Sequence, residues 1–150
     1  MSRRNKRIRL LTEHRQKQLD AAVQQLHRTR TYAEELMSGL ERAQQQHAAA
    51  RQRRDDASQR GITARDWGEL NHWLAATRHT QEQAAEALTR AQADVESARE
   101  AVMTARSAVK QIEALAEREH QRTQNEERRE EQRTTDEHVV GTLSRAGGSL

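Results

Sequence analysis

The sequence predicts an all-α protein: a long antiparallel two-helix coiled-coil hairpin with a C-terminal helical extension. The first observation is an apolar repeat of 3.5 residues from Trp67 to Ala116, with large residues at position a and mostly alanine at position d. Such a repeat specifies a left-handed coiled coil. The second is a composition with 33% charged residues and no Pro, Cys or Phe among 150 residues. Without Pro to break a helix, and with few aromatic residues for a thick core, helices zipped along one seam are favoured.

The first helix is predicted over residues 5 to 58. Its seam carries Leu19, Leu26 and Leu40 at position a, and alanine is frequent at position d. Gly39 interrupts this pattern without ending it, since the apolar stripe continues on both sides. One glycine inside a helix costs only about 1 kcal/mol, so the helix is expected to run past it.

A turn is predicted over residues 59 to 63, and a second helix over residues 64 to 139. Gly61 can take the left-handed conformation that commonly ends a helix. Thr63 and Asp66 have the spacing of a capping box, with an acid in the place of the usual Glu. These signals place the bend of the hairpin close to Gly61.

Folding the chain at this bend brings together residues whose numbers add up to 124. Leu26 then faces Ala98, and Leu40 faces Ala84. Large residues face small ones in almost every layer, which lets two helix axes approach closely. A parallel homodimer is the structural alternative, but it would place Ala against Ala at position d and bury little. The pairing therefore favours a hairpin within one chain.

The second helix is longer than its partner. Beyond the layer of Ile8 and Ala116, the first helix is expected to have no residues left to pair. Residues 117 to 139 are then expected to form a solvated, charged single helix that frays when unbound. Residues 141 to 150, which include two consecutive glycines, are expected to be a disordered tail.

No constellation of residues points to catalysis. None of the seven His lies four residues from another or beside a credible nucleophile, and no Gly-rich phosphate loop is present. Absence of Cys excludes disulfides and thiolate metal sites. No apolar run approaches the roughly 20 residues of a membrane span, and the basic start lacks the apolar segment of a secretory signal. We therefore expect a protein that is not an enzyme, with no catalytic residues, cofactor, metal or direct membrane insertion.

The two charged ends are the main candidate sites. The basic N-terminal segment is either a solvated helix end or an anchor for an acidic surface or nucleic acid. Nothing aromatic interleaves with it, so stacking on bases is unsupported, and the acidic C-terminal segment also argues against nucleic acid despite a sequence pI of about 9.9. The charged extension is either a solvated helix or a segment that enters a partner's cavity. Its length and its lack of an intramolecular partner favour the second interpretation.

The three aromatic residues have different predicted roles. Trp67 lies on the seam, where it is expected to face Ala57 and to be structural. Trp73 and Tyr32 lie off the seam, at position g and beside Ala33 respectively. Since Trp and Tyr are enriched at binding hot spots, both are candidates for contact with a partner.

The C-terminal sequence suggests a family. It runs from an apolar-Lys-x-apolar-Glu segment at Ala108-Val109-Lys110 through Glu130-Glu131-Gln132-Arg133 to Asp136-Glu137. Together with the basic start and the two-helix hairpin, it resembles the FliJ family of type III secretion. This family comprises flagellar FliJ and the injectisome members of the YscO and HrpO type. The lack of Phe departs from the flagellar pattern and favours an injectisome member.

The resemblance implies a non-enzymatic central stalk of the hexameric export ATPase, at the cytoplasmic face of the secretion apparatus. The free ends of the hairpin would enter the ring and promote its assembly and hydrolysis, while the other end would reach the export gate in the membrane. Members also escort chaperones. The residues that would bind the ATPase are Arg3, Arg4, Lys6, Arg7, Arg9, Glu127, Arg128, Arg129, Glu130, Arg133 and Asp136. Tyr32 and Trp73 would contact the gate or another partner. The alternative is a coiled-coil adaptor or chaperone-escort protein that binds secretion substrates or chaperones through its arms.

Overall fold

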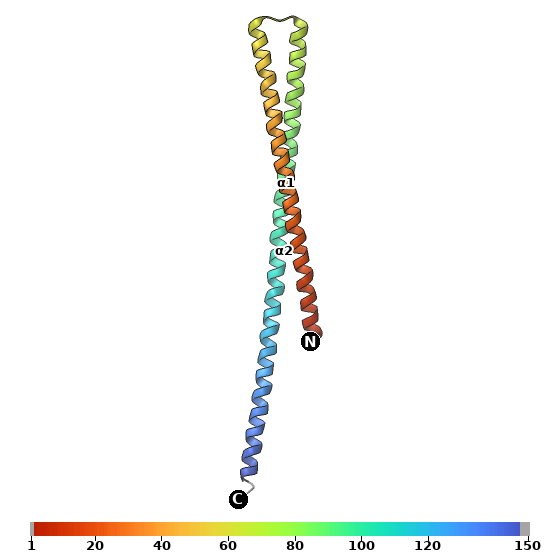
Figure 1. Ribbon diagram of the computed structural model, residues 1–150. Helices are drawn as coiled ribbons and strands as arrows, with labels where there is room; N and C mark the ends of the chain where they lie inside the picture. Colours follow the sequence, from red (N-terminus) through yellow and green to blue (C-terminus); the bar gives the residue numbers. More distant parts are fainter. Residues whose placement is uncertain (1, 148–150) are drawn as a thin grey trace. The chain divides into compact units, whose positions relative to one another are not determined.

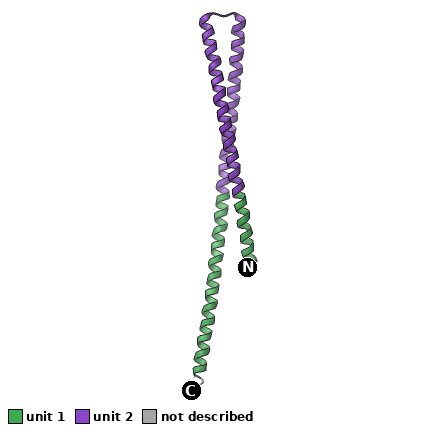
Figure 2. Cartoon of the chain, viewed as in Figure 1, with its two compact units in different colours: residues 1–18, 105–150 green, residues 19–104 purple. Residues whose placement is uncertain are grey.

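The computed structural model describes residues 2–147 and contains two long helices that pack against each other (Figure 1). Helix α1 spans Arg3–Arg60 and helix α2 spans Ala64–Gly147, and no strand occurs within residues 2–147. The predicted all-α helical hairpin is therefore confirmed. The chain divides into two compact units, one of residues 19–104 (unit 2) and one of residues 1–18 and 105–150 (unit 1), as Figure 2 shows.

Unit 2 contains the turn and the two arms that it joins. Its buried residues lie at the predicted a and d positions and include Ala43, Ala50, Leu88, Ala91 and Val102. The register is given by a polar contact across the seam, in which Nδ1 of His47 lies 3.0 Å from Oγ1 of Thr77. The numbers of these two residues add up to 124, as the predicted pairing requires.

The turn is built by local hydrogen bonds. Gly61 has a φ of 76°, and its amide donates to the carbonyl of Ala57 at 3.1 Å, which is the pattern of a left-handed helix cap. Oγ1 of Thr63 accepts a hydrogen bond from the amide of Asp66 at 3.2 Å, as expected of an N-cap. The end of α1 and the start of α2 are thus determined by two residues of the turn, Gly61 and Thr63.

Trp67 differs from its expected role in unit 2. Its surface is 39% exposed, so it is not sealed into the seam as predicted. The two arms lie apart next to the turn and come together farther along (Figure 1). Ala57 instead lines a small hollow with Leu70 and Ile62. Because the capped turn holds the arms apart here, the first layer of the heptad remains open.

Unit 1 contains the beginning of α1 and the second half of α2. Its buried residues are Ile8, Val109, Ile112 and Glu119. Ile8 and Ala116 line the same hollow, which agrees with the predicted layer. Pairing continues one turn beyond that layer, because Glu119 is buried and contacts the first turn of α1. The expectation that pairing stops at Ala116 was therefore wrong by one helical turn.

The extension of α2 is helical to its described end. Residues 125–140 are all exposed, and the helix continues through residues 141–147, which were expected to be disordered; residues 148–150 of that expected tail lie outside the described residues. Oγ1 of Thr142 donates to the carbonyl of His138, and Arg145 lies in the last turn, where a cation complements the helix dipole. The cost of about 1 kcal/mol for Gly141 is too small to end the helix. Fraying of the extension in solution stays a prediction.

Over their described residues, neither α1 nor α2 contains a stretch apolar and long enough to cross a bilayer.

Candidate partner-binding end

The basic N-terminal turn of α1 violates a local rule of helix stability. Ser2 caps the helix, since its Oγ accepts a hydrogen bond from the amide of Asn5 at 3.2 Å. The first turn contains no acid, and Arg3, Arg4 and Lys6 place positive charge at the positive end of the helix dipole, which is unfavourable. Local rules are typically broken where function or a tertiary contact compensates.

The compensating contact comes from α2. Nε of Arg4 lies 3.2 Å from Oε2 of Glu119, whose residue surface is only 8% exposed. Nη2 of Arg122 lies 3.5 Å from the other carboxylate oxygen of Glu119, and Nε of Arg122 lies 3.6 Å from Glu126. Four charged residues therefore form a chain from the N-terminal turn of α1 to the start of the α2 extension.

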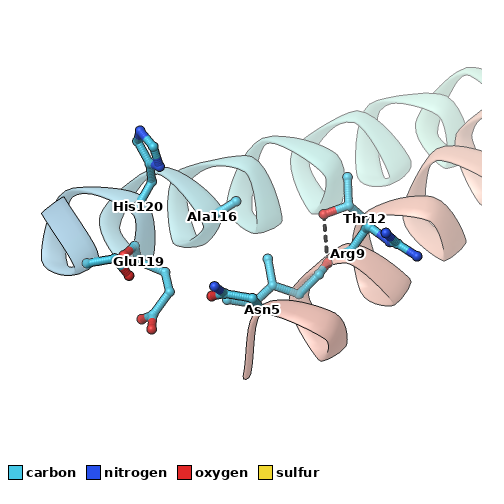
Figure 3. A pocket seen from close by; sticks show the side chains of 8 residues that line it. Asn5, Arg9, Thr12, Ala116, Glu119 and His120 are labelled. Carbon is cyan, nitrogen blue, oxygen red and sulfur yellow. Dashed lines mark hydrogen bonds between the residues drawn. The ribbon is translucent and has the colours of Figure 1, made fainter. Parts of the chain in front are cut away.

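A hollow of about 360 Å³ lies beside this ion pair, between the two helices of unit 1. Figure 3 shows Asn5 of α1 and Glu119 of α2 reaching into the same space, while His120 points away from α1. The hydroxyls of Thr12 and Thr123 donate to the carbonyls of the preceding helical turns. Within residues 2–147 no cluster of three or more potential metal ligands occurs. The ion pair and the hollow bring charged and polar groups of both helices next to one another in unit 1.

The candidate residues of the extension are solvent-exposed along α2. They carry both signs of charge and are Glu127, Arg128, Arg129, Glu130, Arg133 and Asp136. Near them, the hydroxyls of Thr134 and Thr135 donate to the carbonyls of Glu130 and Glu131. These hydroxyl groups are therefore engaged within the helix, and the carboxylates and guanidinium groups dominate the exposed surface.

The structure brings the two charged sets into one unit and leaves the aromatic candidates in the other. Arg3, Arg4, Lys6, Arg7 and Arg9 belong to unit 1 together with the extension residues. Within the described part of the chain, Arg4 contacts Glu119, and Arg9 lies 3.7 Å from Glu13.

Tyr32 and Trp73 belong to unit 2. Tyr32 is 55% exposed. The guanidinium carbon of Arg53 lies 5.6 Å from the centre of the Trp73 ring, within the range of a cation–π contact. Trp73 thus has an intramolecular partner on the opposite arm and retains a partly exposed face.

Sequence reasoning missed two features of unit 1. Glu119 occupies a d position, and the pairing rule places it opposite Asn5, the first residue of the predicted helix, so its burial was available from the register. An exposed apolar cluster of Val139, Val140 and Leu143 lies near the end of α2. The prediction of a disordered tail from residue 141 onward is the reason that this cluster was missed.

Comparison with known proteins gives one clear result. The family model described as flagellar FliJ protein matches residues 5–148, which is nearly the whole chain and includes both candidate ends. No curated protein and no solved structure matches the chain significantly. The helical hairpin and the family match agree, and the chain therefore belongs to the FliJ family, whose members are non-catalytic components of flagellar and related type III protein export.

Proposed function

We propose that this protein is the central stalk of a type III export ATPase, a non-enzymatic subunit of the cytoplasmic part of the export apparatus. Unit 1 enters the hexameric ATPase ring and promotes its assembly and its hydrolysis of ATP. The single observation that carries this proposal is the α2 extension: its residues 125–137 are exposed on every side, are all polar and include both acids and bases. A helix that is polar all round has little to gain from packing on its own chain.

Charge gives the extension a means of recognition. Lys, Arg, Asp and Glu side chains on a protruding helix can pair with complementary charges lining a cavity, which steers association and selects the partner. The basic turn of α1 adds a second charged surface within the same unit. A partner that surrounds unit 1 would contact both, and a ring is the simplest partner that does so.

The test is ATP hydrolysis by the cognate export ATPase in the presence of two forms of this protein. One is the full chain, and the other ends after Gln124, which removes the exposed part of the extension and keeps Glu119 and its ion pairs. We expect the full chain to increase hydrolysis and ring assembly, and the shortened chain to do neither. Assembly is measured by size-exclusion chromatography with light scattering, since a stalk that binds the ring should shift its mass.

A variant of unit 2 serves as the matched control. Trp73→Ala leaves the charged ends intact and removes the aromatic candidate for gate binding. It should stimulate hydrolysis like the full chain and lose binding to the cytoplasmic part of the export gate. Equal stimulation by the full and shortened chains would contradict the stalk function.

A second candidate function is an adaptor that binds secretion chaperones or substrates through the arms. It is favoured by exposed Tyr32 and by an open hollow of about 410 Å³ nearby, lined by Ala33, Met37, Leu88 and Val95 among others. This function predicts that Tyr32→Ala weakens chaperone binding in a pull-down with purified components, and that truncation after Gln124 has no effect there. The two proposals therefore differ in the unit that binding requires, which is unit 1 for the stalk and unit 2 for the adaptor.

A further inference from the structure

We infer that Glu119 is a positioning residue: it seats the N-terminal turn of α1 on α2 through Arg4, and this seating gives unit 1 a binding end built from both helices. The second half of the inference rests on the proposed ATPase-binding function, and the first half does not. Neither the heptad nor the charge pattern assigns this role to Glu119.

The environment of Glu119 is unusual for an acid on a two-helix hairpin. Its side chain is 9% exposed, whereas the side chain of Glu126, one i,i+4 partner of Arg122, is 63% exposed. A carboxylate removed from water requires paired charge or hydrogen bonds. Glu119 has two such partners, one on each oxygen, and only Arg4 comes from the other helix.

The contact between Arg4 and Glu119 compensates for the unfavourable positive charge at the start of α1. A helix start with several cations and no acid repels the positive end of its own dipole, and terminal turns fray unless they are tied down. The carboxylate of Glu119 supplies the missing negative charge from α2. Without it, Ile8, which is buried, is the apolar residue of the described part of α1 that would hold this end of the helix on α2. The neighbours Leu10 and Leu11 are exposed.

Because Glu119 also pairs with Arg122, the contact between Arg4 and Glu119 can open and close. When Arg4 leaves, Glu119 keeps its contact with Arg122, so no buried charge is stranded. Replacing either residue of the Arg4–Glu119 pair should therefore loosen the first turn without unfolding unit 1. Arg3 and Arg7, which are exposed on the same segment, would lose their fixed position beside α2 and with it their shared surface.

The first experiment is hydrogen exchange of the free protein, followed in peptides that cover residues 6–11. Glu119→Gln and Arg4→Gln should each raise exchange there by about fivefold, the effect of one ion pair on local opening. The double variant should exceed neither single variant, because both remove the same contact. Glu126→Gln is the matched control, since this acid also pairs with Arg122 but contacts no residue of the first turn. Equal exchange of residues 6–11 in Glu119→Gln and Glu126→Gln would contradict the proposal that Glu119 holds the first turn of α1 on α2.

The second experiment separates positioning from direct contact with the ATPase. Asn5 and Glu119 line the same hollow, and the sequence contains no cysteine that could interfere. The variant Asn5→Cys/Glu119→Cys therefore replaces the ion pair with a disulfide that can be formed or reduced. We expect the reduced form to bind the ATPase as weakly as Glu119→Gln, a loss of at most about fivefold if only the population of the seated turn changes. The oxidised form should bind like the unmodified protein, although it has no carboxylate.

Weak binding by the oxidised form would overturn the positioning role and indicate that the carboxylate itself contacts the ATPase. If the unmodified protein fails to bind any export ATPase, the proposed function fails and the binding half of the inference falls with it. In that case the exchange measurement still tests whether Glu119 holds the first turn of α1 on α2, because it uses the free protein.

Discussion

At the scale of single residues, the polar layer of His47 and Thr77 is the most specific feature of the seam. The hydroxyl of Thr77 donates to the carbonyl of Leu74 at 2.9 Å. Its oxygen is therefore the acceptor in the contact with Nδ1 of His47 at 3.0 Å, which assigns the imidazole proton to Nδ1. One polar pair inside an apolar seam typically lowers stability and specifies register.

Thr77→Val removes the acceptor for His47 at nearly constant volume. The partly buried imidazole N–H then loses its partner, and we expect unfolding to become easier by about 1 kcal/mol. Thr80→Val is the control, because the Thr80 hydroxyl is exposed and bonds only to the carbonyl of Ala76. Urea denaturation followed by circular dichroism measures both. A Thr77→Val protein as stable as the Thr80→Val protein would show that the polar layer contributes nothing to stability.

The heptad predicts burial well in the middle of each unit and less well at its ends. Ala50, Ala91 and Val102 are buried as their positions require, because two straight, alanine-rich seams can approach closely wherever both helices are present. Trp67 is exposed because the turn separates the arms, and Glu119 is buried because the first turn of α1 contacts it through Arg4. A periodic pattern predicts which face of a helix is buried, but it does not predict how close the neighbouring helix lies.

At the scale of helices, two glycines with opposite backbone conformations test what ends a helix in this chain. Gly61 has a φ of 76°, and Gly141 lies inside α2 with open space around the position of a Cβ atom. Sequence inspection gave the first its correct role as a helix end. The second lies in the segment that was predicted to be a disordered tail, yet the helix runs through it, since a glycine ends a helix only where the conformation or the next residues require it.

Gly141→Ala should raise the helicity of the extension, because alanine favours the helix by about 1 kcal/mol over glycine and meets no neighbour. Gly61→Ala should destabilise the turn by about 1–2 kcal/mol, the cost of the left-handed conformation for a residue with a Cβ. Exchange of amides after residue 135 measures the first effect, and thermal unfolding measures the second. The prediction fails if Gly141→Ala leaves exchange in the extension unchanged.

At the scale of the whole chain, each unit pairs two segments of one molecule, and this pairing can be tested separately in each unit. The register in which paired numbers add up to 124 places Leu26 opposite Ala98 in unit 2 and Ile8 opposite Ala116 in unit 1. Large-to-small pairing in one chain buries more apolar surface than the Ala-to-Ala layers of a parallel dimer, and buried apolar area is the main stabilising term for such helices.

Cysteine pairs test each unit by itself in a chain that is otherwise free of cysteine. Leu26→Cys/Ala98→Cys and Ile8→Cys/Ala116→Cys should oxidise to disulfides within one molecule, because facing seam positions lie near the Cα separation of roughly 4.4–6.8 Å that a disulfide needs. Leu26→Cys/Met103→Cys is the control and should stay reduced, since Met103 is 66% exposed on the outer face of α2. The products are separated by denaturing gel electrophoresis without reductant. A cross-linked monomer from both pairs is the expected result, and cross-linked dimers from either pair would assign that unit to two chains and remove the single-chain hairpin on which the stalk function depends.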